Sequence, residues 1–356
     1  MKNIVICLDG TGNAFGDANS NVFKLYGVLD LTSPFQIAYY HPGLGTMGAP
    51  NALSAVTKWW TRQLGLAFGY GITRNIANAY TFLMENYEPD DRVFLFGFSR
   101  GAYTARALAG MLHMVGLIRA GDHELIAYAA RFLKKPEKTT WALAKAFAET
   151  FARPCKLHFV GVWDTVSSVG WLYDPVKYPY TAKNPSMKIG RHAISIDERR
   201  CCFRQNLWGT PAADQDIRQV WFAGVHSDVG GSYPEAESGL SKVALEWMIE
   251  EAVQAGLLVD ATKIARTLGR APGSFVPPDP DAKIHNSLRS FWLLLELFPR
   301  RFYDNSVTPP VWRWRVPLAE RRRMPEEALI HNSVLVRRSR VHYEPSNLPK
   351  RWTVEA

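Results

Sequence analysis

Residues 92–106 read RVFLFGFSRGAYTAR, and this stretch decides the fold that the rest of the sequence must fit. An apolar, β-rich run leads into Gly97-Phe-Ser99-Arg-Gly101, and a small-residue helical run follows. G-x-S-x-G between a strand and a helix is typical of a nucleophile elbow, a sharp turn that exposes a serine hydroxyl. Glycines on both sides let the strand and the helix approach each other. The stretch predicts Ser99 as a nucleophile, with the backbone N–H of Arg100 at the helix N-terminus as an oxyanion donor.

Short β-rich runs alternate with longer helical runs along the chain, which is typical of an α/β fold. The predicted strands are 3–8, 36–40, 92–96, 156–162 and 219–225. The predicted helices are 22–30, 71–86, 101–114, 123–133, 140–151 and 240–254. We therefore expect an α/β-hydrolase-like fold with a mainly parallel central sheet, helices on both faces and helical insertions.

The domain organisation follows from length and composition. We expect residues 1–356 to form a single α/β-hydrolase domain. The helical segment 116–154, inserted between two core strands, is a candidate cap over the site. Residues 282–356 follow a stretch rich in proline and glycine and are a candidate basic C-terminal extension.

Two further strand ends supply the partners that a serine nucleophile needs. A histidine must take the hydroxyl proton, and a carboxylate must hold the histidine in the right tautomer. Asp164 follows the predicted strand after Ser99, and His226 follows the next one. Both lie past the carboxyl ends of parallel strands, where α/β sheets place their sites, and the order Ser, acid, His is that of α/β-hydrolases. The predicted catalytic set is Ser99, Asp164 and His226.

Alternatives remain for two of these roles. Asp164 can also be interpreted as a residue that only caps the following turn. His331 competes with His226 as the general base, because it also follows Ser99 and lies beside turn-forming residues. Asp228 is an alternative orienting acid or a supporting partner of His226.

The first predicted strand ends in Leu8-Asp9-Gly10-Thr11-Gly12. A glycine-rich turn at this place can supply the second oxyanion N–H, from Gly10 or Thr11. The DGT sequence also resembles phosphatases of the haloacid dehalogenase group, which makes Asp9 an alternative site residue. Their nucleophilic aspartate stands two residues earlier, where this chain has Cys7. The phosphatase alternative therefore lacks its nucleophile.

Composition and charge limit the class of protein. Hydrophobic residues make up 47% of the chain and charged residues 21%, as in an ordinary globular protein. The net charge is +9, and from residue 300 onward twelve Lys or Arg stand against six Asp or Glu. Such a surface attracts anionic phospholipid, nucleic acid or an acidic protein. No apolar stretch approaches the roughly 20 residues that span a bilayer.

The N-terminal run and the cysteines bear on localisation and cofactors. The apolar run 4–8 is too short for a signal-peptide core, which predicts synthesis in the cytoplasm, with export without a signal peptide left open. The four cysteines form no CxxC pair and are expected to be reduced thiols. No metal or other cofactor is expected.

Six motifs together carry a resemblance to a known family. They are LDGTGN near the start, YYHPGLGT at 39–46, GFSRGAYTAR from Gly97, GVWDTVSSVG from Gly161, HAISIDERR from His192 and AGVHSDVGGSY from Ala223. The chain resembles the α/β-hydrolase-domain family of uncharacterised bacterial and fungal proteins that includes the type VI secretion phospholipase effectors, with their Tle-like catalytic domain. The resemblance implies a Ser-Asp-His triad that cleaves acyl chains from phospholipids, at Ser99, Asp164 and His226.

The expected function is hydrolysis of carboxylic esters, most of all as a phospholipase, through an acyl-enzyme on Ser99. The alternatives are a soluble carboxylesterase on small esters and a non-catalytic lipid- or partner-binding module of the same fold. The expected partners are an ester or phospholipid substrate, an anionic membrane surface and a secretion-machine or immunity protein. Nucleic acid is not favoured. The better-known effectors carry an added membrane-anchoring module, for which the basic tail with Trp312, Trp314 and Trp352 is a candidate substitute.

Overall fold

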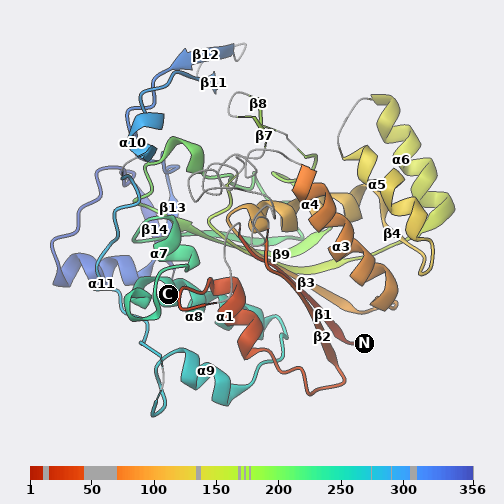
Figure 1. Ribbon diagram of the computed structural model, residues 1–356, viewed down its shortest axis with the longest axis horizontal. Coiled ribbons are helices and arrows are strands. Elements are labelled where there is room, and N and C mark those ends of the chain that lie inside the picture. The colour runs from red at the N-terminus through yellow and green to blue at the C-terminus, as the bar shows by residue number, and fades with distance from the viewer. Residues whose placement is uncertain are drawn as a thin grey trace, which may run out of the picture.

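The computed structural model describes residues 1–10, 16–43, 70–133, 138–166, 170–171, 174–175, 178–273, 275–289, 291–304 and 311–355. Its main sheet consists of β1 (Asn3–Leu8), β2 (Gln36–His41), β3 (Arg92–Phe98), β6 (Leu157–Trp163), β9 (Met187–Ser195), β10 (Asp216–Phe222), β13 (Ala328–His331) and β14 (Trp352–Glu355). The strand order is β14-β13-β10-β9-β6-β3-β1-β2, and every neighbouring pair is parallel (Figure 1). The predicted α/β fold with a mainly parallel sheet is confirmed.

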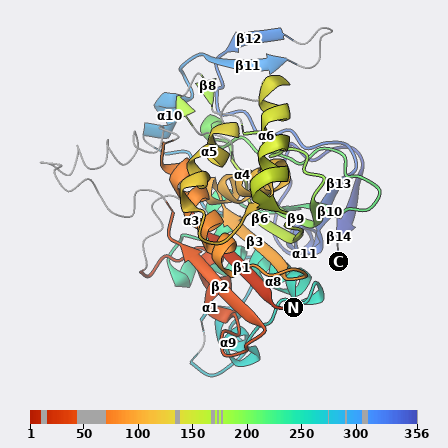
Figure 2. The same ribbon diagram turned by 90° about the vertical axis from the view of Figure 1, so that its right-hand side faces the viewer.

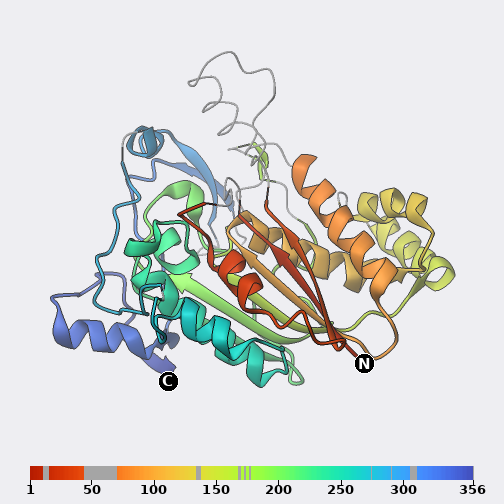
Figure 3. The same ribbon diagram turned by 60° about the horizontal axis from the view of Figure 1, so that its bottom comes forward.

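Helices cover both faces of this sheet (Figures 2 and 3). The longer ones are α1 (Asn21–Val28), α3 (Tyr70–Asn86), α4 (Arg100–Val115), α5 (Ile126–Phe132), α6 (Lys138–Phe151), α8 (Gly239–Gln254), α9 (Ala261–Thr267) and α11 (Asn332–Arg340). The short helices are α7 (His226–Gly230) and α10 (Phe291–Leu295), with 3-10 turns η1 (His123–Leu125), η2 (Cys201–Phe203) and η3 (Glu235–Glu237). The remaining strands are β4 (Leu117–Ile118), β5 (Ala152–Arg153), β7 (Gly170–Trp171), β8 (Asp174–Pro175), β11 (Arg300–Asp304) and β12 (Val311–Arg315).

The alternation of side chains along each strand divides the core into two halves. In β1, Ile4 and Ile6 pack in one hydrophobic cluster with residues of α3 and α4. Val5 and Cys7 pack in the other, with residues of α1 and α8. All of β1 is buried, as expected for a strand in the middle of a parallel sheet covered on both sides.

Strand β9 lies between β6 and β10, where no strand was predicted. Its sequence, MKIGRHAIS, carries charged residues that weaken the apolar pattern of a buried strand. Arg191 is nonetheless buried, because it pairs with Glu251 on α8 and, at 2.6 Å, with Asp216 at the start of β10. The partners that neutralise this arginine come from distant parts of the chain. The strand could therefore not be predicted from the sequence pattern.

The segment predicted as a cap leaves and rejoins the core at the C-terminal end of α4, where β4 and β5 pair antiparallel. Its helix α5 packs on α3, and its helix α6 packs on α4, so both extend one helical layer. Its function as a cap stays a prediction.

The C-terminal region contributes to the main sheet. β13 pairs with β10, and β14 pairs with β13. A third hydrophobic cluster joins them to β9 and β10 through residues such as Ile194, Trp221 and Ile330. The helix α10 and the β11–β12 hairpin stand above the sheet in Figure 1. Within the described ranges, no helix is both long enough and apolar enough to cross a membrane.

Candidate active site

Ser99 lies on the turn between β3 and α4, with φ of 59° and ψ of −120°. A non-glycine residue adopts such a backbone only where the surrounding structure imposes it. A Cβ on Gly97 would fall 2.6 Å from the carbonyl oxygen of Gly101. One on Gly101 would fall 2.1 Å from the carbonyl oxygen of Leu8, at the end of β1. The two glycines therefore let α4 begin against two strand ends, with its N-terminus beside the serine.

Ser99, His226 and Asp164 form a continuous hydrogen-bonded series. The Ser99 Oγ atom is 2.8 Å from His226 Nε2. The Nδ1 atom of the same ring is 2.5 Å from Asp164 Oδ2. The three residues follow β3, β10 and β6, and all three side chains are buried. The predicted residues are thus brought together at the carboxyl edge of the sheet, although 127 positions separate Ser99 from His226.

The environment of His226 favours a neutral imidazole. Its burial lowers the pKa, the bond to Asp164 opposes this, and the pKa stays below its ordinary value. An ionised Asp164 accepts a hydrogen bond from Nδ1–H, so Nε2 carries the lone pair that faces the Ser99 hydroxyl. The rings of Phe98 and Phe203 pack against the imidazole, each with its centroid 4.7 Å away. The geometry therefore suits the transfer of a proton from Ser99 Oγ to His226 Nε2.

Asp164 is surrounded by donors that the sequence did not predict. It is fully buried and adopts φ of 40° just past β6. Oδ1 accepts from the N–H of Ser195 at 2.9 Å, and Arg322 pairs with both carboxylate oxygens. Burial would raise the pKa of Asp164, but Arg322 and His226 hold it well below its usual range. Arg322 was missed because it lies 158 positions from Asp164, in a run of three arginines without a motif.

A second ion pair fixes the start of α7. The backbone N–H of His226 donates to Glu198 Oε2 at 3.2 Å, and Arg200 pairs with this oxygen at 2.9 Å. Burial raises the pKa of Glu198, but Arg200 lowers it to about 2. Glu198 and Ser195 belong to the HAISIDERR motif, so the sequence did contain a signal for them.

The alternative residues have other partners. His331 stacks on Phe222, and its Nδ1 atom lies 2.8 Å from the hydroxyl of Ser333 while its side chain caps α11. Asp228 lies 2.5 Å from His285 Nδ1 and accepts from the N–H of Val225 at 3.0 Å. Neither residue is hydrogen-bonded to Ser99 or to the His226 ring.

The loop after β1 adjoins the first turn of α4, as the contact between Leu8 and Gly101 requires. Asp9 Oδ2 accepts from Ser20 Oγ at 2.5 Å and from the Tyr40 hydroxyl at 2.7 Å, which ties β1 to α1 and β2. Asp9 Oδ1 accepts from the N–H of Gly10 at 2.6 Å. Thr11, the other predicted donor on this loop, lies outside the described residues.

A cavity of about 660 Å³ is lined by residues of α4 and of the segments 178–185 and 205–207, and its described lining does not include Ser99, Asp164 or His226. Tyr103, one helical turn along α4 from Ser99, lines it together with Tyr178, Tyr180 and Asn206. The N–H of Asn206 donates to the carbonyl of Thr165, the residue after Asp164. Across the described ranges, no three His, Cys, Asp or Glu side chains are grouped so that they could hold a metal ion.

Residues 2–251 match the family model described as "T6SS, Phospholipase effector Tle1-like, catalytic domain". The chain belongs to this family. The predicted resemblance is thereby confirmed, and the chain carries the catalytic domain of a Tle1-like hydrolase family. Arg322 and the strands β13 and β14 lie beyond the matched residues.

Individual relatives of this Tle1-like chain share only part of their length with it. A protein of Saccharomyces cerevisiae, uncharacterized protein YEL023C, is 40% identical over 221 residues, which cover 57% of this chain and 32% of that protein. An uncharacterized protein from Pseudomonas aeruginosa with a crystal structure has a TM-score of 0.48 at 19% identity, covering 74% of this chain and 48% of that one. The Tle1 effector solved on the VgrG spike has a TM-score of 0.33 at 20% identity, covering 67% and 52%. The chain thus spans about half or less of each.

Proposed function

We propose that this protein is a serine hydrolase that cleaves acyl esters of phospholipids through a Ser99-His226-Asp164 triad. The observation that carries the proposal is the unbroken hydrogen-bonded series from Ser99 Oγ through His226 to Asp164, at a strained elbow. Membership in a family of phospholipase effector domains supports the lipid substrate.

The reaction follows from this geometry. Ser99 Oγ attacks the ester carbonyl carbon while its proton passes to His226 Nε2, and the carbonyl oxygen becomes an oxyanion. The bond to the alcohol then breaks, and the leaving oxygen takes the proton from His226. Water next attacks the acyl group on Ser99 and gives a proton to His226. When the acyl–Oγ bond breaks, this proton returns to Ser99 and the fatty acid leaves.

The oxyanion needs donors that are in place before the reaction. The N–H of Arg100 begins α4, where the helix dipole also favours negative charge. In our proposal, the loop after β1 supplies the second donor. Because the N–H of Gly10 donates to Asp9, this group serves only if that bond opens, whereas an N–H from Thr11 would leave it intact.

We also propose that the protein meets lipid through an apolar surface on α10 and the hairpin, here called the α10–hairpin surface. Its apolar side chains are half or more exposed: Leu293, Leu294, Leu297, Phe298, Trp314 and Leu318. Grouped exposed apolar side chains are typical of interaction sites, and tryptophan suits the membrane interface. Exposed Arg313 and the basic C-terminal region complement anionic headgroups. Helix α10 links this surface to the triad, because its Trp292 packs on Phe203 at 5.4 Å and Phe203 packs on His226.

The decisive experiment compares wild type with Ser99→Ala on vesicles of anionic phospholipid and on a short-chain p-nitrophenyl ester. We expect the wild type to release fatty acid and lysophospholipid and to react with a fluorophosphonate probe, and Ser99→Ala to do neither. Loss of the nucleophile lowers turnover by roughly 10⁴-fold or more in triad enzymes. Hydrolysis of the short ester alone indicates a carboxylesterase. An unlabelled wild type indicates a binding module.

The family's description as type VI secretion effectors supports a secretion-machine partner. Co-purification of the intact protein with a spike protein of that machine tests this part of the proposal. Its failure leaves the hydrolase proposal unaffected.

A further inference from the structure

A buried arginine from the C-terminal region reaches the carboxylate of the proposed triad. Arg322 lies in the segment between β12 and β13, and it is only 5% exposed. Its Nη1 atom is 2.5 Å from Asp164 Oδ1, and its Nη2 atom is 2.9 Å from Asp164 Oδ2. Two parallel N–H···O bonds of this kind need the planar fork of a guanidinium, which an ammonium does not provide.

These bonds complete the hydrogen bonding of Asp164. Oδ1 also accepts from the Ser195 N–H, and Oδ2 also accepts from His226 Nδ1. Each oxygen thus has two donors, which is the capacity of an ionised carboxylate. With both oxygens held, the carboxylate has a single orientation toward the imidazole.

Arg322 is itself held in place from its other side. Its Nη1 atom donates to Ser195 Oγ at 2.8 Å, and its Nη2 atom donates to the Phe203 carbonyl. The Arg322 carbonyl accepts from Asn347 at 3.0 Å. A guanidinium bonded on both sides and buried in this way has little freedom to move.

We propose that Arg322 is a positioning residue that holds Asp164 toward His226 and adds a positive charge behind the carboxylate, which limits the basicity of His226. The inference rests on the proposed function. The other charged or titratable groups that face this pair are Glu198 and Arg200, in the segment that follows β9, and His192 on β9. Glu198 raises the pKa of His226 and Arg200 lowers it.

The positive charge has a measurable consequence. Asp164 stabilises the imidazolium form of His226, and Arg322 offsets part of this stabilisation. Without Arg322, His226 keeps its proton to higher pH. The acid limb of the pH profile of kcat/KM, which reports His226 in the free enzyme, then moves upward.

The test uses Arg322→Ala and Arg322→Lys in the full chain, on a soluble short-chain ester that requires no membrane contact. For Arg322→Ala, we expect kcat to fall by about 10-fold to about 10⁴-fold, the upper value being the cost of misorienting the triad histidine. We expect its KM to change by less than about 2-fold. We expect its acid limb to move upward by about one pH unit. Added ethylguanidinium should restore part of the rate. Arg322→Lys removes the planar fork, so its kcat should fall. It keeps the positive charge, so its acid limb should move by less than half as much as that of Arg322→Ala.

Arg323→Ala is the matched control, because Arg323 is the next residue and its side chain is 82% exposed. It should leave kcat and the pH profile unchanged. A folded Arg322→Ala variant with wild-type kcat and pH profile overturns the inference. So does a lowered kcat with an unmoved acid limb and no rescue, because that pattern indicates only a structural role. If Arg322→Ala does not fold, a wild-type kcat in Arg322→Lys overturns it. Failure of the proposed function is distinct, since the wild type would then not hydrolyse the ester.

Discussion

Gly230 on α7 packs against the ring of Phe98 at the end of β3, so closely that a Cβ on Gly230 would fall 1.9 Å from Phe98 Cε2. The Phe98 ring in turn packs on His226, the first residue of α7, with centroids 4.7 Å apart. One short helix thus presents its histidine to Ser99 only because its last residue has no side chain.

Gly230→Ala should therefore disturb the site through packing. The added methyl group must displace the Phe98 ring or α7, and overpacking of this kind costs about 1–3 kcal/mol. We expect a lower Tm, measured by thermal unfolding, together with reduced ester hydrolysis. Gly209→Ala is the control, because its Cβ would come no closer than 3.8 Å to another atom. Equal effects of the two substitutions would contradict the packing argument.

The general base can be assigned by comparing two histidine variants. We expect His226→Ala to lower kcat by several orders of magnitude, since His226 alone of the two is hydrogen-bonded to Ser99. We expect His331→Ala to keep the rate of the wild type on a short ester, because that side chain caps α11 and stacks on Phe222. Circular dichroism should show both variants folded. An inactive, folded His331→Ala protein would reverse the assignment.

Stability should depend on pH through His331. Burial lowers its pKa to about 4, whereas a histidine in an unfolded chain titrates near 6.5. Between these values the unfolded state binds a proton that the folded state does not, so the free energy of unfolding falls as the pH falls from about 6.5 to about 4. His331→Asn keeps a helix-capping side chain and removes the titration. We expect its loss of stability between pH 7 and pH 4.5, measured by urea unfolding, to be smaller than that of the wild type by about 2 kcal/mol. An equal loss of stability in both proteins would refute the lowered pKa of His331 as a source of the pH dependence.

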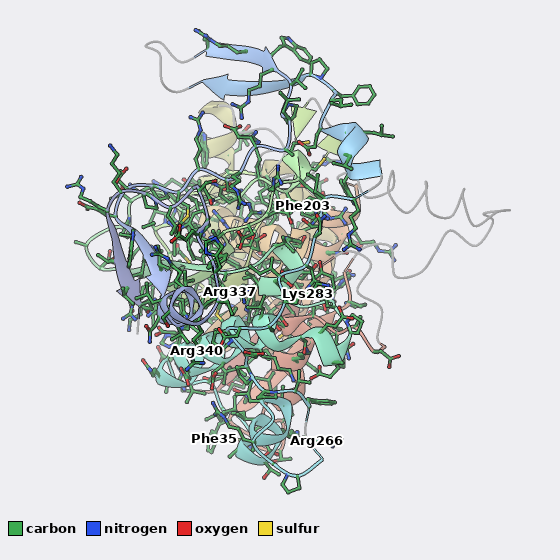
Figure 4. The ribbon with its side chains drawn as sticks, turned by 90° about the vertical axis from the view of Figure 1, so that its left-hand side faces the viewer. Phe35, Phe203, Arg266, Lys283, Arg337 and Arg340 are labelled. Atoms are coloured by element: carbon green, nitrogen blue, oxygen red, sulfur yellow. The ribbon has the colours of Figure 1, made fainter. Side chains whose placement is uncertain are left out.

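The α10–hairpin surface should affect the rate of hydrolysis on vesicles but not on a soluble ester. Leu294→Glu with Leu297→Glu introduces two negative charges on this surface, and we expect hydrolysis of anionic vesicles to fall at least about 10-fold, since each charge removes apolar contact and repels headgroups. The rate on a short soluble ester should not change. Phe35→Glu is the matched control. Phe35 is 64% exposed and lies at the end of the molecule opposite the hairpin, whereas Phe203 lies toward it (Figure 4). A similar loss on vesicles in Phe35→Glu would argue against a defined docking surface.

Local patterns sufficed to predict the elbow and the strand ends. Ser99, Asp164 and His226 each follow an apolar run directly, and a parallel sheet brings the carboxyl ends of its strands to one edge. Long-range pairing could not be predicted in this way. The partners of Arg191 and Arg322 lie far along the chain, and no periodicity distinguishes a buried arginine from an exposed one. The expected strand at 219–225 is β10 at Asp216–Phe222: its polar first residues obscured where it begins, and the apolar residues that follow Phe222 extended the predicted strand past its end.

The order of strands in the main sheet also bears on how the protein is assembled during synthesis. From β3 onward, each strand pairs with the one translated before it, in the sequence β6, β9, β10, β13 and β14. A nascent chain that leaves the ribosome can thus extend its sheet outward one strand at a time, and no late strand has to be threaded between two earlier ones. Parallel strands pair slowly, and the unpaired edge strand is prone to aggregation until the next strand pairs with it. In this topology only one strand edge, that of the most recently added strand beyond β3, has to be protected from aggregation at any moment.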